Sequence, residues 1–133
     1  MPIEYVSRFP VDDVLLSALH ARAFGADTEV VTPWAARLDR HALTWIGAVD
    51  AGRLVGFVQV CWDGGEHAFL LDTAVDPGWR HRGVGAGLVA AAVADSTAAG
   101  CTWLHVDFED RLSAFYLDRC GFRGTAAGLL RLT

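Results

Sequence analysis

Hydrophobic positions recur along this chain with two different periods, and the two periods alternate from segment to segment. Runs in which about every second residue is apolar predict β-strands. Such strands are expected over residues 2–9, 43–49, 54–61, 66–75 and 101–108, before a final stretch that ends at Leu132. Runs with apolar residues three and four positions apart predict helices. Helices are expected from Asp12 onward and over residues 33–41, 85–99 and 110–119.

Turn residues indicate how the expected strands pair. Residues 50–53 (Asp-Ala-Gly-Arg) and 62–65 (Trp-Asp-Gly-Gly) are typical of hairpin links, which make adjacent strands antiparallel. The helix over residues 85–99 instead lies between two strands, as in a β-α-β crossover. No repeat, low-complexity tract or linker interrupts the sequence. We therefore expect a single α/β domain over residues 1–133, with a mainly antiparallel sheet.

The charged residues exclude several classes of protein. The chain carries 11 cationic and 16 acidic residues, a formal net charge of −5, and every cation is an arginine. Without lysine, neither a Schiff-base enzyme nor a Walker-type phosphate loop is available. An acidic chain also argues against nucleic-acid binding and slightly favours a cationic small substrate.

Cysteine spacing and the lengths of the apolar runs indicate the compartment. Cys61, Cys101 and Cys120 are far apart and form no Cys-x-x-Cys pair, as is typical of a reducing environment. The N-terminus has no apolar signal core, and the longest uncharged run, residues 83–94, is too short to cross a membrane. The sequence therefore predicts a cytoplasmic protein without a membrane partner.

The most informative segment joins the strand over residues 66–75 to the helix after it. The N–H groups of a helix's first turn have no internal partner and carry partial positive charge, so they bind phosphate readily. Gly83 and Gly85 leave this turn open because glycine has no side chain to block the approach, and an Arg-His-Arg run before Gly83 adds positive charge. The segment predicts a phosphate or pyrophosphate site. The structural alternative is a glycine-rich helix start packed closely on a strand.

The same segment contains Arg80-x-x-Gly83-x-Gly85, which resembles the R-x-x-G-x-G/A motif of the GNAT N-acetyltransferase superfamily. The preceding Val75-x-Pro77, the apolar helix that follows, the order of the elements and the Cys-Gly-Phe at 120–122 are also similar to that superfamily. The resemblance implies a splayed, mixed but mostly antiparallel sheet of about six or seven strands flanked by about four helices.

The resemblance also implies a co-substrate, acetyl-coenzyme A, and the residues that bind it. Its pyrophosphate would lie on the loop and helix start, formed by Arg80, His81, Arg82, Gly83, Val84, Gly85 and Ala86. Its pantetheine arm would lie in the gap of the splayed sheet and pair, like an added strand, with Thr73, Ala74 and Val75. A main-chain amide near Ala74 or Val75 would polarise the thioester carbonyl.

Residues 85–90 also satisfy the G-x-G-x-x-G/A pattern of dinucleotide-binding proteins, with Asp107 placed for a ribose contact. That pattern directly follows its strand, whereas residues 76–82 intervene here. Too few residues follow Ala90 to complete a doubly wound sheet. Spacing therefore favours the acetyltransferase resemblance.

A general acid must protonate the leaving thiolate. The resemblance implies direct attack by the amine in a ternary complex, and commonly a tyrosine acid in a helix ending Y-x-x-x-G-F. Counted back from Gly121-Phe122, the tyrosine position holds Leu117, and Tyr116 lies one residue early, about 100° around the helix. Alternatively, Tyr116 fits and the helix end carries an insertion. Tyr116 is the candidate acid, with packing into the sheet as its structural alternative.

Two carboxylates are candidates for handling the proton of the amine. Strand alternation places Asp72 on an otherwise apolar face with Ala68 and Leu70, where its pKa is expected to rise. Asp107 shares a face with His105 on the next strand. Structural roles stay open for both: Asp72 caps a loop or pairs with an arginine, and Asp107 lies on a solvated face. A metal site along that second face is weakly indicated, so no metal is expected.

Together these features predict an N-acetyltransferase that moves an acetyl group from acetyl-coenzyme A to a primary amine of a small molecule. Two alternatives stay open. One is a non-catalytic acyl-coenzyme A binding or sensing module, motivated by the displaced tyrosine, and the other is an enzyme that acts on peptides or proteins. Trp34, Trp45 and Trp62 either face the substrate or pack in the core. The oligomeric state is left open, a homodimer included.

Overall fold

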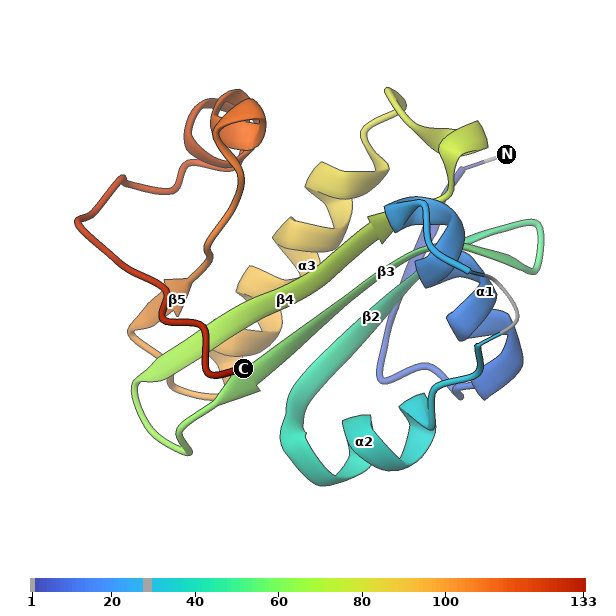
Figure 1. Cartoon of the computed structure of the whole chain (residues 1–133), viewed down its shortest axis with the longest axis horizontal. Coiled ribbons are helices and arrows are strands. Elements are labelled where there is room, and N and C mark those ends of the chain that lie inside the picture. Colours follow the sequence, from blue (N-terminus) through green and yellow to red (C-terminus); the bar gives the residue numbers. More distant parts are fainter. Residues whose placement is uncertain (1, 28–29) are drawn as a thin grey trace.

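The computed structural model describes residues 2–27 and 30–133 of the chain. Its centre is a five-stranded sheet in the order β1-β2-β3-β4-β5 (Figure 1). Neighbouring strands from β1 to β4 run antiparallel, and β5 lies parallel to β4, as the hairpin turns and the crossover helix predict. The strands are β1 (Glu4–Ser7), β2 (Ala42–Asp50), β3 (Arg53–Trp62), β4 (His67–Val75) and β5 (Trp103–His105).

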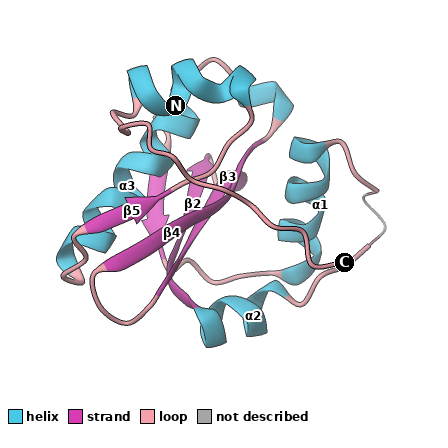
Figure 2. Ribbon diagram, turned by 60° about the vertical axis from the view of Figure 1, so that its left-hand side comes forward, coloured by secondary structure: helices cyan, strands magenta, loops and turns pink. Residues whose placement is uncertain are grey.

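Helices cover both faces of the sheet (Figures 1 and 2). The helices α1 (Asp13–Phe24) and α2 (Trp34–His41) pack on one face, and α3 (Val84–Ala98) packs on the other. The start of α1 is set by Asp12, whose carboxylate accepts two N–H groups of the first turn. Gly25 ends α1 in the left-handed conformation (φ 68°), which glycine adopts without strain.

The sheet separates two apolar cores. On the α3 side, Ile46 and Leu88 belong to one cluster and are fully shielded from solvent. On the α1–α2 side, Phe57 packs with Leu16 and Leu38, which are shielded as well. Burial of such a side chain contributes about 1.5–3 kcal/mol to stability. Because helices cover both faces of the sheet, β3 and β4 are held in fixed positions. The side chains at the ends of these strands are therefore fixed as well.

The sheet has five strands, fewer than the six or seven expected. The strand predicted over residues 101–108 is confined to Trp103–His105, and the final stretch, residues 120–133, forms neither helix nor strand. A strand must pair its backbone along an edge, and the Gly- and Ala-rich segment 124–128 is poorly suited to do so. Leu129, Leu130 and Leu132 accordingly stay exposed.

The strands β4 and β5 separate after a short stretch of pairing. Among the described residues, their pairing is confined to residues 67–69 of β4 and 103–105 of β5. Beyond this point β4 continues to Val75, while the chain after β5 turns away from it toward a short 3-10 turn, Asp110–Leu112 (Figure 1). The splayed sheet that the resemblance implies is therefore confirmed.

A β-bulge in β4 changes which side chains share a face. Phe57 pairs with Ala74 but Gln59 pairs with Leu71, so β4 holds one more residue than β3 over this interval. Asp72 lies in the bulge with a positive φ of 58°. The predicted common face of Asp72 with Ala68 and Leu70 is wrong, because strand alternation does not continue through a bulge.

The Asp76 side chain connects the loop after β4 to α1 and β3 through hydrogen bonds and ion pairs. Its buried carboxylate accepts the Gly78 N–H at 3.1 Å and the Arg22 guanidinium at 2.9 Å, and an Arg53 nitrogen lies 3.6 Å away. Burial acts to raise the pKa of this carboxyl, but the bonds from Gly78 and Arg22 outweigh burial and hold the pKa below its usual value.

We expect Asp76→Asn to lower the free energy of unfolding by about 2 kcal/mol at neutral pH, because charge-assisted hydrogen bonds are lost. The pKa of Asp76 is lower in the folded than in the unfolded chain. Its charge therefore stabilises the fold above the ordinary aspartate pKa, and this contribution is lost as the pH falls through the folded value. Urea unfolding of both proteins at neutral pH and at roughly pH 3 measures the effect. The difference in free energy of unfolding between the two proteins should shrink in acid. An equal difference at both pH values would contradict a stabilising role for the Asp76 charge.

Candidate active site

The N-terminus of α3 has no side-chain cap. Gly83 precedes the helix with φ 81°, and the first hydrogen bond of the helix runs from the Gly87 N–H to the Gly83 carbonyl at 3.0 Å. The N–H groups of Val84, Gly85 and Ala86 consequently have no partner within the helix. They lie at its positive end, where phosphate groups bind in many proteins.

The two motif glycines lie against a second helical turn, Ala114–Arg119. A Cβ atom on Gly85 would lie 3.1 Å from the Phe115 ring, closer than side chains normally pack. A Cβ atom on Gly83 would lie 3.3 Å from a guanidinium nitrogen of Arg119. Close packing therefore contributes to the need for glycine at position 85, although the close contact is with this helical turn and not with a strand as the structural alternative expected.

Three cationic or polar side chains directly precede this helix start in the chain, and a fourth, that of Arg119, lies beside Gly83. Arg80 donates to the carbonyl of Ala23 at 2.7 Å, which ties the loop to the end of α1. His81 adopts a positive φ of 63°, and Arg82 lies over the ring of Trp79. Arg119, which the sequence reading did not single out, adds positive charge beside the positive end of α3. Such a charge is unfavourable there alone and favours a bound anion.

Tyr116 lies in a π-helical turn, Ala114–Arg119, rather than in the α-helix expected over residues 110–119. The Cys120 N–H donates to the carbonyl of Phe115, five residues earlier, at 2.9 Å. A π-turn holds one more residue than an α-turn. The geometry thus matches the alternative in which the helix end before Gly121 carries an insertion.

The Tyr116 side chain points to the place where β4 and β5 separate. Tyr116 is 6% exposed, its ring stacks on Phe108 with centroids 4.9 Å apart, and its hydroxyl lies beside the Thr73 side chain. Burial raises the pKa of Tyr116; the Thr73 side chain opposes this effect, while the nearby Cys120 and Asp107 add to it. The hydroxyl therefore stays protonated at neutral pH and is able to donate a proton.

The candidate pantetheine residues form the end of β4. Ala74 is buried, and Thr73 and Val75 are half-buried. Within the described part of the chain, the edge of β4 from residue 70 to Val75 has no strand partner on the β5 side. An extended molecule is therefore able to pair with this edge, as an added strand does.

Asp72 faces the α1–α2 side of the sheet, where its two carboxylate oxygens are both engaged. Nε2 of His20 lies 2.9 Å from one oxygen, and Nε2 of Gln59 donates to the other at 2.6 Å. Burial acts to raise the pKa of Asp72, but the bonds from His20 and Gln59 and the charge of Arg37 outweigh it, so the pKa is lowered. The expected rise of this pKa is wrong because a hydrogen-bonded carboxylate replaces the isolated one assumed from strand alternation.

Sequence reasoning missed His20 and Gln59. His20 follows Leu19 and lies four residues after Leu16 on the buried side of α1, and its ring packs against Trp34 with centroids 5.1 Å apart. A histidine on an otherwise apolar helical stripe was the available signal for this position. It is unspecific, because such residues are usually structural.

Asp107 lies apart from Asp72 and His20, on an exposed stretch after β5, although its charge acts on Tyr116. His105, expected on the same face, bonds instead to His67, with His67 Nδ1 and His105 Nε2 2.8 Å apart, and stacks on Phe69.

Over residues 2–27 and 30–133, no three His, Cys, Asp or Glu side chains lie close enough to hold a metal ion. Over the same residues, no helix combines the length and apolarity needed to cross a membrane.

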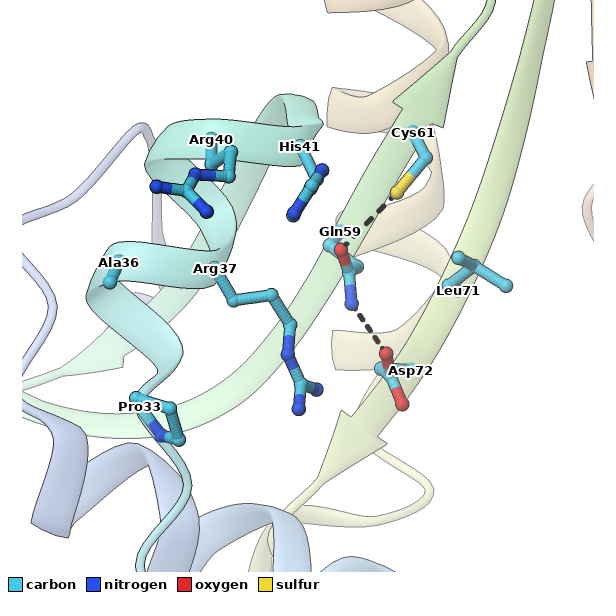
Figure 3. A pocket seen from close by; sticks show the side chains of 9 residues that line it. All are labelled: Pro33, Ala36, Arg37, Arg40, His41, Gln59, Cys61, Leu71 and Asp72. Atoms are coloured by element: carbon cyan, nitrogen blue, oxygen red, sulfur yellow. Dashed lines mark hydrogen bonds between the residues drawn. The ribbon is translucent and has the colours of Figure 1, made fainter.

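A cavity of about 670 Å³ lies between α2 and the strands β3 and β4 (Figure 3). Asp72 and Gln59 form its strand wall together with Cys61 and Leu71, and α2 supplies the opposite wall. Of the three candidate tryptophans, Trp34 and Trp45 are buried in the core on the α1–α2 side of the sheet, and Trp62 is exposed at the end of β3; none of them lines this cavity. The cavity and the Tyr116 hydroxyl thus lie on opposite sides of the same bulge, at Asp72 and Thr73.

Solved structures share this architecture. A GNAT-family acetyltransferase from Streptococcus pneumoniae superposes with a TM-score of 0.76 at 20% identity, covering 99% of this chain and 98% of that one. An acetyltransferase from Trypanosoma brucei gives 0.78 at 21% identity, covering 99% of each chain. An aminoglycoside N-acetyltransferase in complex with CoA gives 0.76 at 18% identity, covering 99% of this chain and 95% of that one. At these identities the likeness establishes the fold.

Sequence comparison identifies the family. A mycothiol acetyltransferase from Rhodococcus jostii is 33% identical over 98 residues, which are 68% of this chain and 31% of that protein. The chain thus spans about a third of the length of this relative. The acetyltransferase (GNAT) family matches residues 13–122, from the start of α1 to the residue after Gly121. The chain belongs to the acetyltransferase (GNAT) family.

Proposed function

We propose that the protein is an acyl-coenzyme A-dependent N-acetyltransferase that moves the acetyl group of acetyl-coenzyme A to a primary amine of a small molecule. One observation carries the proposal. The buried Tyr116 hydroxyl meets Thr73 at the point where β4 and β5 separate, beside the uncapped start of α3. A proton donor, an unpaired strand edge and an anion-binding helix end therefore converge within one region.

In this proposal the donor's pyrophosphate binds the N–H groups of Val84, Gly85 and Ala86. Arg82 and Arg119 supply the flanking charge, and Arg80 holds the loop against α1. The pantetheine arm pairs with the unpaired edge of β4, from Thr73 to Val75, and brings the thioester to the bulge. These residues fit an anionic, extended donor, because the helix end supplies unsatisfied donors and the strand edge supplies both donors and acceptors.

The amine approaches from the cavity on the α1–α2 side. Its nitrogen attacks the thioester carbon, so that a C–N bond forms and the C–S bond breaks, while a β4 amide near Ala74 polarises the carbonyl oxygen. The ammonium proton passes to the hydrogen-bonded pair of Asp72 and His20, and Tyr116 gives its proton to the departing thiolate. Asp107 contributes through its charge, which helps to keep Tyr116 protonated.

Ligand-dependent stabilisation combined with turnover tests the proposal. A ligand at a hundred times its dissociation constant adds about 2.7 kcal/mol to stability. We expect acetyl-coenzyme A and coenzyme A to raise Tm, a nicotinamide dinucleotide to leave it unchanged, and an amine panel to drive thiol release from acetyl-coenzyme A. Stabilisation without release over small amines and peptides would favour the non-catalytic module. No stabilisation by either coenzyme A species would overturn the donor site.

A further inference from the structure

Positive charge gathers on one wall of the acceptor-side cavity, although the chain as a whole carries a formal charge of −5. Arg37, Arg40 and His41 line the cavity from α2, at positions three and four apart and therefore on one side of the helix. The opposite wall contributes one carboxylate, that of Asp72. A purely cationic acceptor would meet two guanidinium groups here, so the local charge opposes the preference that the net charge suggests.

Arg37 is held in place while its hydrogen-bond donors stay unoccupied. Its guanidinium lies over the ring of buried Trp34, 4.9 Å from the centroid. Figure 3 shows Arg37 reaching from α2 toward the strand wall near Asp72, whereas Arg40 lies further from the strands. In the part of the chain that the structure describes, neither guanidinium donates a hydrogen bond or forms an ion pair, and the Asp72 oxygens are bonded elsewhere.

We propose that the acceptor of this enzyme is an amine that also carries an anionic group, a carboxylate or a phosphate, and that Arg37 binds this group with Arg40 beside it. The inference rests on the proposed acetyl transfer. The planar guanidinium fork matches two oxygens of a carboxylate or phosphate, and stacking on Trp34 orients it before the ligand arrives. The amine end of the same molecule then lies at Asp72 on the strand wall.

Matched acceptor pairs test this inference. Phosphoethanolamine is compared with ethanolamine, and β-alanine with propylamine, so that each pair differs in the anionic group. We expect kcat/KM for at least one anionic member to exceed that of its partner by about ten- to a hundredfold, as charge-assisted hydrogen bonds imply. The two pairs distinguish phosphate from carboxylate. Equal or better use of ethanolamine and propylamine, which lack the anionic group, would overturn the inference and leave acetyl transfer intact.

Substitutions of Arg37 test whether this residue causes the preference for the anionic acceptor. Arg37→Gln should remove the preference for the anionic member, mainly through KM, and Arg37→Lys should keep part of it, because a lysine retains charge without the fork. Arg111→Gln is the matched control, since Arg111 is exposed and pairs with Glu109 outside the cavity. A preference unchanged in Arg37→Gln would overturn the assignment.

Calorimetric titration with phosphoethanolamine and β-alanine in the presence of coenzyme A gives a readout that does not need turnover. Binding that is lost in Arg37→Gln, without thiol release from any amine, would support the anion site while contradicting the proposed function. If neither binding nor turnover were observed, the anion site and the proposed function would both be overturned.

Discussion

Replacing Tyr116 by phenylalanine is expected to lower kcat for acetyl transfer by about 10²–10⁴-fold, the usual contribution of a general acid. The substitution removes one oxygen and keeps the ring that stacks on Phe108 and packs against Phe115. The affinity for acetyl-coenzyme A should stay within about twofold, because the donor is held by main-chain groups and arginines elsewhere. Steady-state kinetics with acetyl-coenzyme A and the best amine measure both quantities.

The chain offers a matched control in its second tyrosine. Tyr5 lies on β1 with part of its ring exposed, away from the separated strands. Tyr5→Phe should leave kcat unchanged. The loss of the buried hydroxyl beside Thr73 should lower the free energy of unfolding of Tyr116→Phe by about 1 kcal/mol, too little to unfold the protein. If Tyr116→Phe kept the wild-type kcat, Tyr116 would be a packing residue and not the acid.

The pH dependence follows from the direction of the Tyr116 pKa. Burial is the main cause that raises it above the ordinary value of 10.0. A protonated hydroxyl is the active form, so activity should not decline through deprotonation of Tyr116 between neutral pH and about pH 9. A loss of kcat in that interval that is absent from the Phe variant would contradict the raised pKa.

Strand and helix positions, hairpin pairing and the crossover were predictable because hydrophobic periodicity and turn residues are local signals. Two of the differences from the expected elements occur where one extra residue enters a regular element. The bulge at Asp72 changes the face of its side chain, and a π-turn replaces the end of the α-helix expected over residues 110–119. The bulge depends on the neighbouring strand and cannot be read from composition or period, whereas the spacing between Tyr116 and Gly121 indicates an insertion at the helix end as one of two alternatives.

The sequence singles out the residues of the candidate phosphate loop but not those on the acceptor side of the candidate site. Gly83 and Gly85 carry a motif with fixed spacing, whereas Arg37, His20 and Gln59 come from three separate elements that meet only in the folded chain. Long-range hydrogen bonding also reversed the expected direction of the Asp72 pKa. The pKa of a carboxyl group depends on its hydrogen-bond partners and nearby charges, and not on its strand position alone.

Asp72→Asn is expected to lower kcat/KM by about 100-fold, the lower range for loss of a proton-handling group. Asparagine keeps the shape of the side chain and tolerates the positive φ at this position, so the bulge should persist. It removes the negative charge that faces the amine. It also leaves one of the donors from His20 and Gln59 without a good acceptor, at a cost of about 1–3 kcal/mol in stability.

The form of the pH profile separates a role in the reaction from a structural one. The Asp72 pKa lies below the ordinary 3.8, so the carboxylate is charged throughout the range in which the enzyme would be assayed. Removing that charge should therefore lower kcat/KM at every pH from about 6 to 9. Asp39→Asn, an exposed change of equal charge on α2, should leave kcat/KM within about twofold. A variant at position 72 that matched this control in activity, while losing only stability, would place Asp72 among the residues that merely hold α1 to the sheet.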